Sequence, residues 1–203
     1  MVDAALIQQC ADPGLTPAIV TRFIAEAGSP DPLAVTVRLG GRVVLVPRPS
    51  TADEAMALIR QHVGKAVVRV GVTQYPAGFG VTDVADLKPN LVDACANIRI
   101  GTKLFAKVYR IVTKWYGNAV DEAFDDAIYA WKTGNFEGKA VFSEPDPGDV
   151  KLAVTASERP GEGSGTAAAE ASAQPRAEPG DPNKAGIRID LSGIGGSPAR
   201  RDR

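Results

Sequence analysis

A single acidic side chain, Glu26, is placed where the sequence could position a general acid. Apolar residues repeat at helical spacing across residues 17–27, and Gly28 can end that helix. Glu26 then lies in the last turn, close to Phe23. Burial against Phe23 and the negative end of the helix dipole would both favour the protonated carboxyl, the form in which a general acid donates its proton. The alternative is a solvated surface glutamate at a helix end.

The two cysteines, Cys10 and Cys95, leave two alternatives open. They are either free buried thiols of a cytosolic protein or one disulfide of a protein in an oxidising compartment. A bridge closing a loop of this length would stabilise the fold by roughly 4–5 kcal/mol in the chain-entropy description. His62 is the single histidine and falls in a predicted helix, and no cysteine pair has metal-ligand spacing. We therefore expect neither a metal site nor a cofactor.

The periodicity of the chain predicts a mainly helical domain with a small β part. Gly40-Gly41 is typical of a hairpin turn, because both residues tolerate positive φ. Asn118 is the expected cap of the last helix, and Gly134 its expected end. A cleft between the helical and β parts is a usual place for a ligand. The predicted elements are a helix over 17–27, a hairpin over 33–47, a helix over 52–63, an extended segment over 65–75, and helices over 91–116 and 119–132.

Composition and charge exclude several classes of partner. The chain has 203 residues, is 44% hydrophobic and carries a net charge of −1, with lysine and arginine scattered along it. That distribution gives no reason to expect nucleic-acid binding. No apolar run is long enough to cross a membrane. The first residues are too short and too polar for a signal peptide, so we expect a mature form.

The composition changes after Phe142. Residues 143–203 contain no aromatic side chain and are rich in Pro, Gly, Ala, Ser and Glu. Such a segment buries too little apolar surface to offset the entropy of ordering, so we expect a disordered tail. We therefore divide the chain into a folded domain over 1–142 and a tail over 143–203. Within the tail, residues 187–194 alternate like a strand, which indicates either a short motif that adds to a partner's sheet or chance alternation.

Several short motifs, in order and at fitting spacing from about Leu6 to Gly138, resemble the VirB1-type lytic transglycosylases of type IV secretion and conjugation systems. These proteins have a goose-type lysozyme-like fold. The motifs that carry the resemblance are Leu6-Ile7-Gln8-Gln9-Cys10-Ala11, Glu26-Ala27-Gly28 with Asp31-Pro32, Gly40-Gly41-Arg42, Val46-Pro47-Arg48, Gly71-Val72-Thr73-Gln74-Tyr75, Cys95-Ala96-Asn97-Ile98-Arg99-Ile100-Gly101 and Ala130-Trp131-Lys132-Thr133-Gly134-Asn135.

The resemblance implies cleavage of the β-1,4 bond between N-acetylmuramic acid and N-acetylglucosamine in peptidoglycan, with a 1,6-anhydro product. Glu26 is the residue it carries to the position of the single catalytic acid and base, although an ungapped alignment anchored on Pro32 places Ala27 there. Implied substrate contacts are Gln74 through its amide, Tyr75 through its ring, and the Trp131-Lys132 pair. It also favours a Cys10–Cys95 disulfide.

Two functions follow from the resemblance. The first is a periplasmic transglycosylase that opens the cell wall locally for a secretion or conjugation machine. The second is a catalytically impaired relative that binds glycan or components of the machine as an assembly factor. Expected partners are peptidoglycan glycan strands and type IV secretion components, with the C-terminal tail as one contact.

Overall fold

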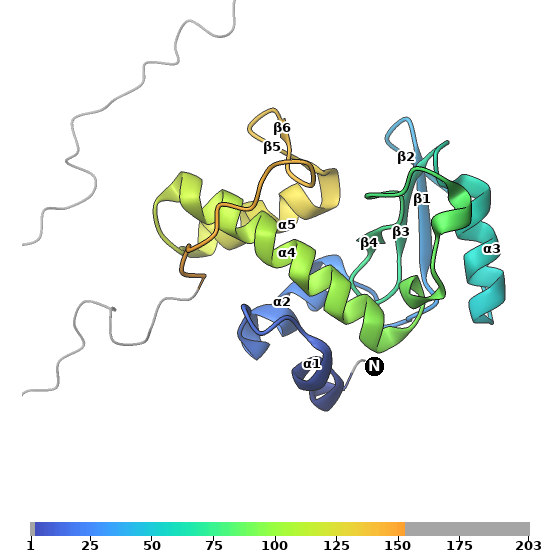
Figure 1. Ribbon diagram of the computed structural model, residues 1–203, viewed down its shortest axis with the longest axis horizontal. Helices are drawn as coiled ribbons and strands as arrows, with labels where there is room; N and C mark the ends of the chain where they lie inside the picture. The colour runs from blue at the N-terminus through green and yellow to red at the C-terminus, as the bar shows by residue number, and fades with distance from the viewer. Residues whose placement is uncertain (1–2, 153–203) are drawn as a thin grey trace, which may run out of the picture. The chain divides into compact units, whose positions relative to one another are not determined.

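The structure of the protein is a computed structural model (Figure 1), and the residues that it describes are 3–152. It combines helices with a small antiparallel sheet, as predicted. The α-helices are α1 (Ala4–Cys10), α2 (Pro17–Ala27), α3 (Ala52–His62), α4 (Ala94–Tyr116) and α5 (Asp121–Thr133). The strands are β1 (Val35–Leu39), β2 (Arg42–Val44), β3 (Val67–Val70), β4 (Tyr75–Pro76), β5 (Asn135–Phe136) and β6 (Lys139–Ala140). Two 3₁₀ turns are η1 (Val84–Asp86) and η2 (Pro89–Leu91).

Helix α2 forms as its sequence predicts. The hydroxyl of Thr16 accepts a hydrogen bond from the Ile19 N–H at 3.4 Å, and Pro17 occupies the first turn. Gly28 is the C-cap, and its N–H donates to the carbonyl of Ile24 at 2.9 Å. The segment therefore has both the start and the end that its capping residues specify.

The two later helices begin after the residues predicted for them. Helix α4 starts at Ala94, because Asp93 is its N-cap and accepts from the Ala96 N–H at 2.8 Å. Leu91, predicted as the first residue of this helix, lies in η2 instead. Helix α5 starts at Asp121, and Asn118 is not its cap: Val120 holds that position without a side-chain hydrogen bond.

The sheet has the strand order β2-β1-β3-β4, with antiparallel pairing throughout. Gly40 and Gly41, with φ of 56° and 80°, make the predicted hairpin turn between β1 and β2. Alternation gives the sheet two different faces. The apolar face packs against α3, whereas Thr36 and Arg69, which are directly paired across β1 and β3, lie on the other face.

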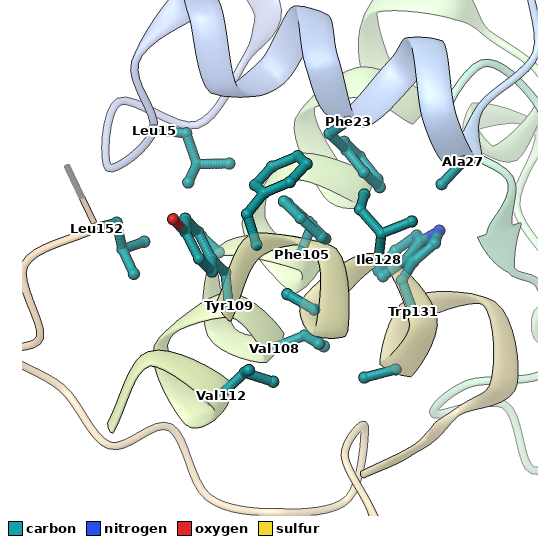
Figure 2. Packing of buried hydrophobic residues seen from close by; sticks show 14 of the residues in the cluster. Leu15, Phe23, Ala27, Phe105, Val108, Tyr109, Val112, Ile128, Trp131 and Leu152 are labelled. Carbon is teal, nitrogen blue, oxygen red and sulfur yellow. The ribbon is translucent and has the colours of Figure 1, made fainter. Parts of the chain in front are cut away.

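Most of the core lies between helices. Long helix α4 crosses the centre of the fold, with α5 packed along it (Figure 1). Phe23 of α2 stacks on Phe105 of α4, with ring centroids 4.0 Å apart, and meets Trp131 of α5 edge-on. Figure 2 shows these side chains converging from three helices, with Ala27 above Trp131. The aromatic cluster thus joins α2, α4 and α5 into one unit.

A disulfide joins Cys10, at the end of α1, to Cys95, in the first turn of α4. The predicted pairing is confirmed. The bridge spans 85 residues, so it restricts the unfolded chain by roughly 4–5 kcal/mol in the chain-entropy description. It fixes the N-terminal helix against the start of the central one, beside buried Val72 and Ile98.

The described chain runs ten residues past the predicted domain boundary at Phe142. Val150 and Leu152 pack on the helical core, and Arg110 of α4 pairs with Asp146. The rest of the predicted tail, including 187–194, lies outside the described residues. Within residues 3–152, no helix is both long and apolar enough to cross a membrane.

Helix α4 and the segment after β3 approach so closely that only glycine fits between them. A Cβ at Gly101 would lie 2.1 Å from the Thr73 hydroxyl oxygen and 2.4 Å from the Thr73 Cβ. On the other side of this contact, a Cβ at Gly71 would lie 2.4 Å from the amide nitrogen of Asn97. The two glycines allow the backbones to meet.

We predict that Gly101→Ala lowers the free energy of unfolding by about 1–3 kcal/mol, the usual cost of overpacking a tight core. Urea denaturation followed by circular dichroism measures it. Lys103→Ala, at an exposed position on the same helix, is the matched control and should stay close to the wild type. Equal stability of the two variants would contradict the close approach.

Candidate functional site

The turn from Gly71 to Gln74 is held by one buried amide. Asn97, fully buried in α4, donates to the carbonyls of Val70 (3.1 Å) and Leu91 (2.8 Å). Its amide oxygen accepts from the N–H and the hydroxyl of Thr73, both at 2.9 Å. With four hydrogen bonds the side chain is fully satisfied, so the turn has a fixed position on the helix.

Gln74 has an unusual backbone for a residue with a side chain. Its φ is 50°, in the left-handed region that favours glycine. Its amide nitrogen donates to the Gly71 carbonyl at 3.0 Å, and its amide oxygen accepts from the Thr36 hydroxyl at 2.8 Å. Strained residues that are held in this way gather at binding sites and active sites.

Arg69 is a buried cation with no carboxylate partner among the described residues. Its guanidinium, in a residue 6% exposed, donates from Nη2 to the carbonyls of Trp131 (2.5 Å) and Lys132 (3.2 Å). A third bond runs from Nη1 to the Gln74 carbonyl at 3.4 Å, and the rings of Trp131 and Phe142 lie 5.6 and 5.3 Å from the guanidinium carbon. Arg69 thus caps the C-terminal, negative end of α5.

Burial, and less strongly the neighbouring charge of Arg38, lower the pKa of Arg69 to about 10. Both effects disfavour the charged form. The cation is therefore kept in place by carbonyls and aromatic faces, against desolvation and against repulsion from a second cation.

These side chains form a groove of about 150 Å³ between the polar face of the sheet and the ends of α2 and α5. We call it the sheet–helix groove. Its charged side chains are all cationic: Arg38, Arg69 and Lys132. The complete lining is Ala27, Thr36, Arg38, Val43, Arg69, Gln74, Trp131 and Lys132.

Of the residues expected to contact substrate, Gln74, Trp131 and Lys132 do line this groove. Trp131, however, is 1% exposed; its indole N–H donates to the Thr73 carbonyl at 3.1 Å, so it acts mainly as a core residue. Tyr75 does not line the groove. It packs against the helical core and against the apolar side chains between the sheet and α3, and burial raises the pKa of its phenol.

Glu26, the expected catalytic residue, does not line the groove; its neighbour Ala27 does. The Glu26 carboxylate accepts from Arg22 Nε at 2.8 Å, one turn earlier on α2, and its side chain is 38% exposed. Arg22 also pairs with Asp121 (3.1 Å) and Asp125 (2.6 Å) of α5. Glu26 therefore belongs to an exposed ion-pair cluster and does not lie beside Gln74 in the groove.

A larger hollow of about 870 Å³ lies between the start of α2 and the start of α5. It is lined by apolar side chains together with Arg22, Asp121 and Glu122. Its single cation, Arg22, already pairs with Asp121, and its lining includes no strained residue or buried cation. The sheet–helix groove is the better candidate site, because unusual backbone and uncompensated charge coincide there.

Arg69, Arg38 and Thr36 were not anticipated from the sequence. The one available signal was an arginine inside the otherwise apolar strand segment of residues 67–70. Such a residue is costly to bury unless it has partners. Among the described residues, no three His, Cys, Asp or Glu side chains gather as metal ligands would.

Comparison with known proteins gives two matches. The sequence model of a family described as TraH_2 matches residues 1–196. The chain is also similar to a Sinorhizobium fredii (strain NBRC 101917 / NGR234) protein named "Uncharacterized protein y4dP". The two are 54% identical over 203 residues, which cover 97% of this chain and 100% of the relative. No solved structure matches the chain.

The expected membership of the VirB1-type lytic transglycosylases is wrong, because the matching family is TraH_2 over almost the whole chain and not a lysozyme-like family. With no solved structure to compare, the lysozyme-like fold stays a prediction. Two residues of the motifs that suggested this fold, Asn97 and Gly101, have packing roles in the structure.

We predict that Gln74→Ala destabilises the protein by about 1–3 kcal/mol, since two side-chain hydrogen bonds are lost while the left-handed backbone remains. Gln74→Gly loses the same bonds but relieves a strain of about 1–2 kcal/mol, so it should be the more stable of the two. Thermal and urea unfolding of both variants measure the difference. A glycine variant that is less stable than the alanine variant would contradict a positive φ at residue 74.

Proposed function

Since the chain belongs to the TraH_2 family of conjugal transfer proteins, we propose that it is a component of a conjugation apparatus that binds a ligand in the sheet–helix groove and does not cleave glycan. The role is that of an assembly or recognition factor. This role is similar to the second function expected from the sequence, an assembly factor that binds glycan or components of the machine. It does not require that the protein be related to transglycosylases.

One observation carries this proposal: the groove contains cations and an amide but no carboxyl group. Cleavage of a glycosidic bond requires an acid within hydrogen-bonding reach of the leaving oxygen. The residue at the end of α2 that lines the groove is Ala27, whose methyl group can neither donate nor accept a proton. Arg69, Arg38 and Lys132 instead supply hydrogen-bond donors.

Glu26 supports the same conclusion from outside the groove. Its carboxylate is bonded to Arg22, within a cluster that also includes Asp121 and Asp125. Exposed ion pairs of this kind contribute little to stability, typically about 0–1 kcal/mol each. A surface role for Glu26 therefore accounts for its contacts without any reaction.

We propose that the protein acts in the periplasm, and the Cys10–Cys95 disulfide supports this location. Disulfides persist in oxidising compartments and are rare in the cytosol. Peptidoglycan strands remain a candidate partner there, since a cationic groove can bind acidic groups of the wall. A contact with the apparatus through the tail would involve residues outside the described range.

We predict that deletion of the gene from a conjugation donor lowers the transfer frequency, and that Glu26→Gln restores it as fully as the wild type. The substitution removes only an exposed ion pair. Mating assays with plasmid-borne complementation measure the frequency. Immunoblots of the donor confirm that both proteins are present at equal levels.

The same variant tests glycan cleavage directly. Purified wild-type protein is mixed with purified peptidoglycan and the turbidity is followed, with a known muramidase as the positive control. Under our proposal neither protein clears the suspension. Clearing by the wild type that Glu26→Gln abolishes would restore the transglycosylase and end the binding proposal.

For the location, we predict that protein isolated from its host after rapid acid quenching and thiol alkylation carries no alkylated cysteine, because Cys10 and Cys95 are bridged. Mass spectrometry of the intact protein reads the result. As control, a sample reduced before alkylation should gain two adducts. Two adducts without reduction would place the protein in a reducing compartment.

A further inference from the structure

The sheet–helix groove brings three cations together from three separate parts of the fold. Arg38 lies on β1, Arg69 on β3, and Lys132 in the last turn of α5. Within residues 3–152 every side-chain ion pair is made by Arg22 or Arg110, so no groove cation has a carboxylate partner there. Positive charges placed together without an acid repel one another, and a bound anion relieves that repulsion.

The groove also has a fixed frame. Thr36 lies on the same face of the sheet as Arg69, because the two residues are directly paired across the strands. Its hydroxyl and the Gln74 amide are bonded to each other and hold the wall in place. Arg69 uses three N–H groups on backbone carbonyls, which leaves two of its five donors without a protein partner in the described structure.

We propose that this groove is a binding site for one oxyanion, a carboxylate or a phosphate group, carried by a larger molecule. The inference rests on the proposed binding function and names the chemistry of its ligand. Arg69 is the buried cation of the groove and supplies positive potential. Arg38 and Lys132 are exposed and can contact an anion that enters from solvent.

The size of the groove limits what enters it. A volume of about 150 Å³ is below the range of roughly 300–1,000 Å³ that encloses a drug-sized ligand. A charged group has room in such a space, and the remainder of a larger molecule stays outside. The ligand is therefore recognised by its acidic end and not by enclosure of its whole body.

The two tryptophans make the site directly observable. The indole N–H of Trp131 is bonded to the Thr73 carbonyl at the groove wall, whereas Trp115 is 59% exposed and does not line the groove. Full-length ¹⁵N-labelled protein is titrated at low ionic strength with inorganic phosphate and, separately, with acetate. Chloride at equal ionic strength is the reference.

We expect saturable shifts of the Trp131 indole and Gln74 amide signals, with the Trp115 indole unmoved. Arg38→Gln and Lys132→Gln should each weaken the apparent Kd about ten-fold, the loss expected for one charged hydrogen bond. Lys103→Gln removes one exposed cation outside the groove and should bind as the wild type does. Arg69 is left intact, because its loss would disturb the end of α5.

The two titrations distinguish the sources of the charge. Tighter binding of phosphate indicates a phosphorylated ligand, and tighter binding of acetate indicates a carboxylate of a peptide or an acidic sugar. Shifts no larger than those with chloride, or an equal loss of binding in Lys103→Gln, would overturn the site. That result would leave the conjugation phenotype untouched, since mating assays test the proposed function separately.

Discussion

The buried amide of Asn97 is the interaction on which the rest of the fold depends. It bonds α4 to both sides of the segment that follows β3, through Val70, Leu91 and Thr73. In a low-dielectric interior a fully satisfied amide is rigid, and a half-satisfied one would be costly. This requirement explains why glycines stand at 71 and 101, since any side chain there would push the amide and the turn apart.

From that anchor the contacts continue outward to the groove. Thr73, held by Asn97, offers its carbonyl to the Trp131 indole, and Gln74 offers its own to Arg69. Arg69 in turn binds the last carbonyls of α5. The sheet is thereby attached to the helical core through polar groups. If the turn from Gly71 to Gln74 were displaced, the groove residues Gln74, Arg69 and Trp131 would move with it.

The sequence predicts local structure well, but it does not predict which way the side chains of a helix face in the folded protein. Gly40-Gly41 and the capping residue Thr16 specify the hairpin and the start of α2, because each acts on neighbouring backbone. Which residue of α2 faces the groove depends on the rotation of the helix, and one residue corresponds to about 100°. That difference separates Ala27, which lines the groove, from Glu26, which pairs with Arg22.

The cations of the groove could not be predicted from the sequence for a related reason. Their roles depend on packing between segments that are distant in the sequence. In the sequence, Arg69 is a charged residue within an apolar strand. Its role is evident only in the structure, where it binds the carbonyls at the end of α5. The last carbonyls of a helix carry roughly −0.5 of an elementary charge, which offsets part of one cation. That partial charge, with the rings of Trp131 and Phe142, accounts for Arg69 as a structural residue.

Arg38 has no such offset among the described residues, and Lys132 shares only the partial charge at the end of α5. Neither has a carboxylate partner there, and both are exposed to solvent. Different cations of the groove therefore have different roles: Arg69 stabilises the fold, and Arg38 and Lys132 are the proposed ligand contacts. Arg69 is required for the groove to exist, so its substitution would report on folding. Arg38 and Lys132 can be changed without removing a buried contact, so their substitution reports on binding. Surface charges so placed guide an oppositely charged group toward the site and weaken with salt.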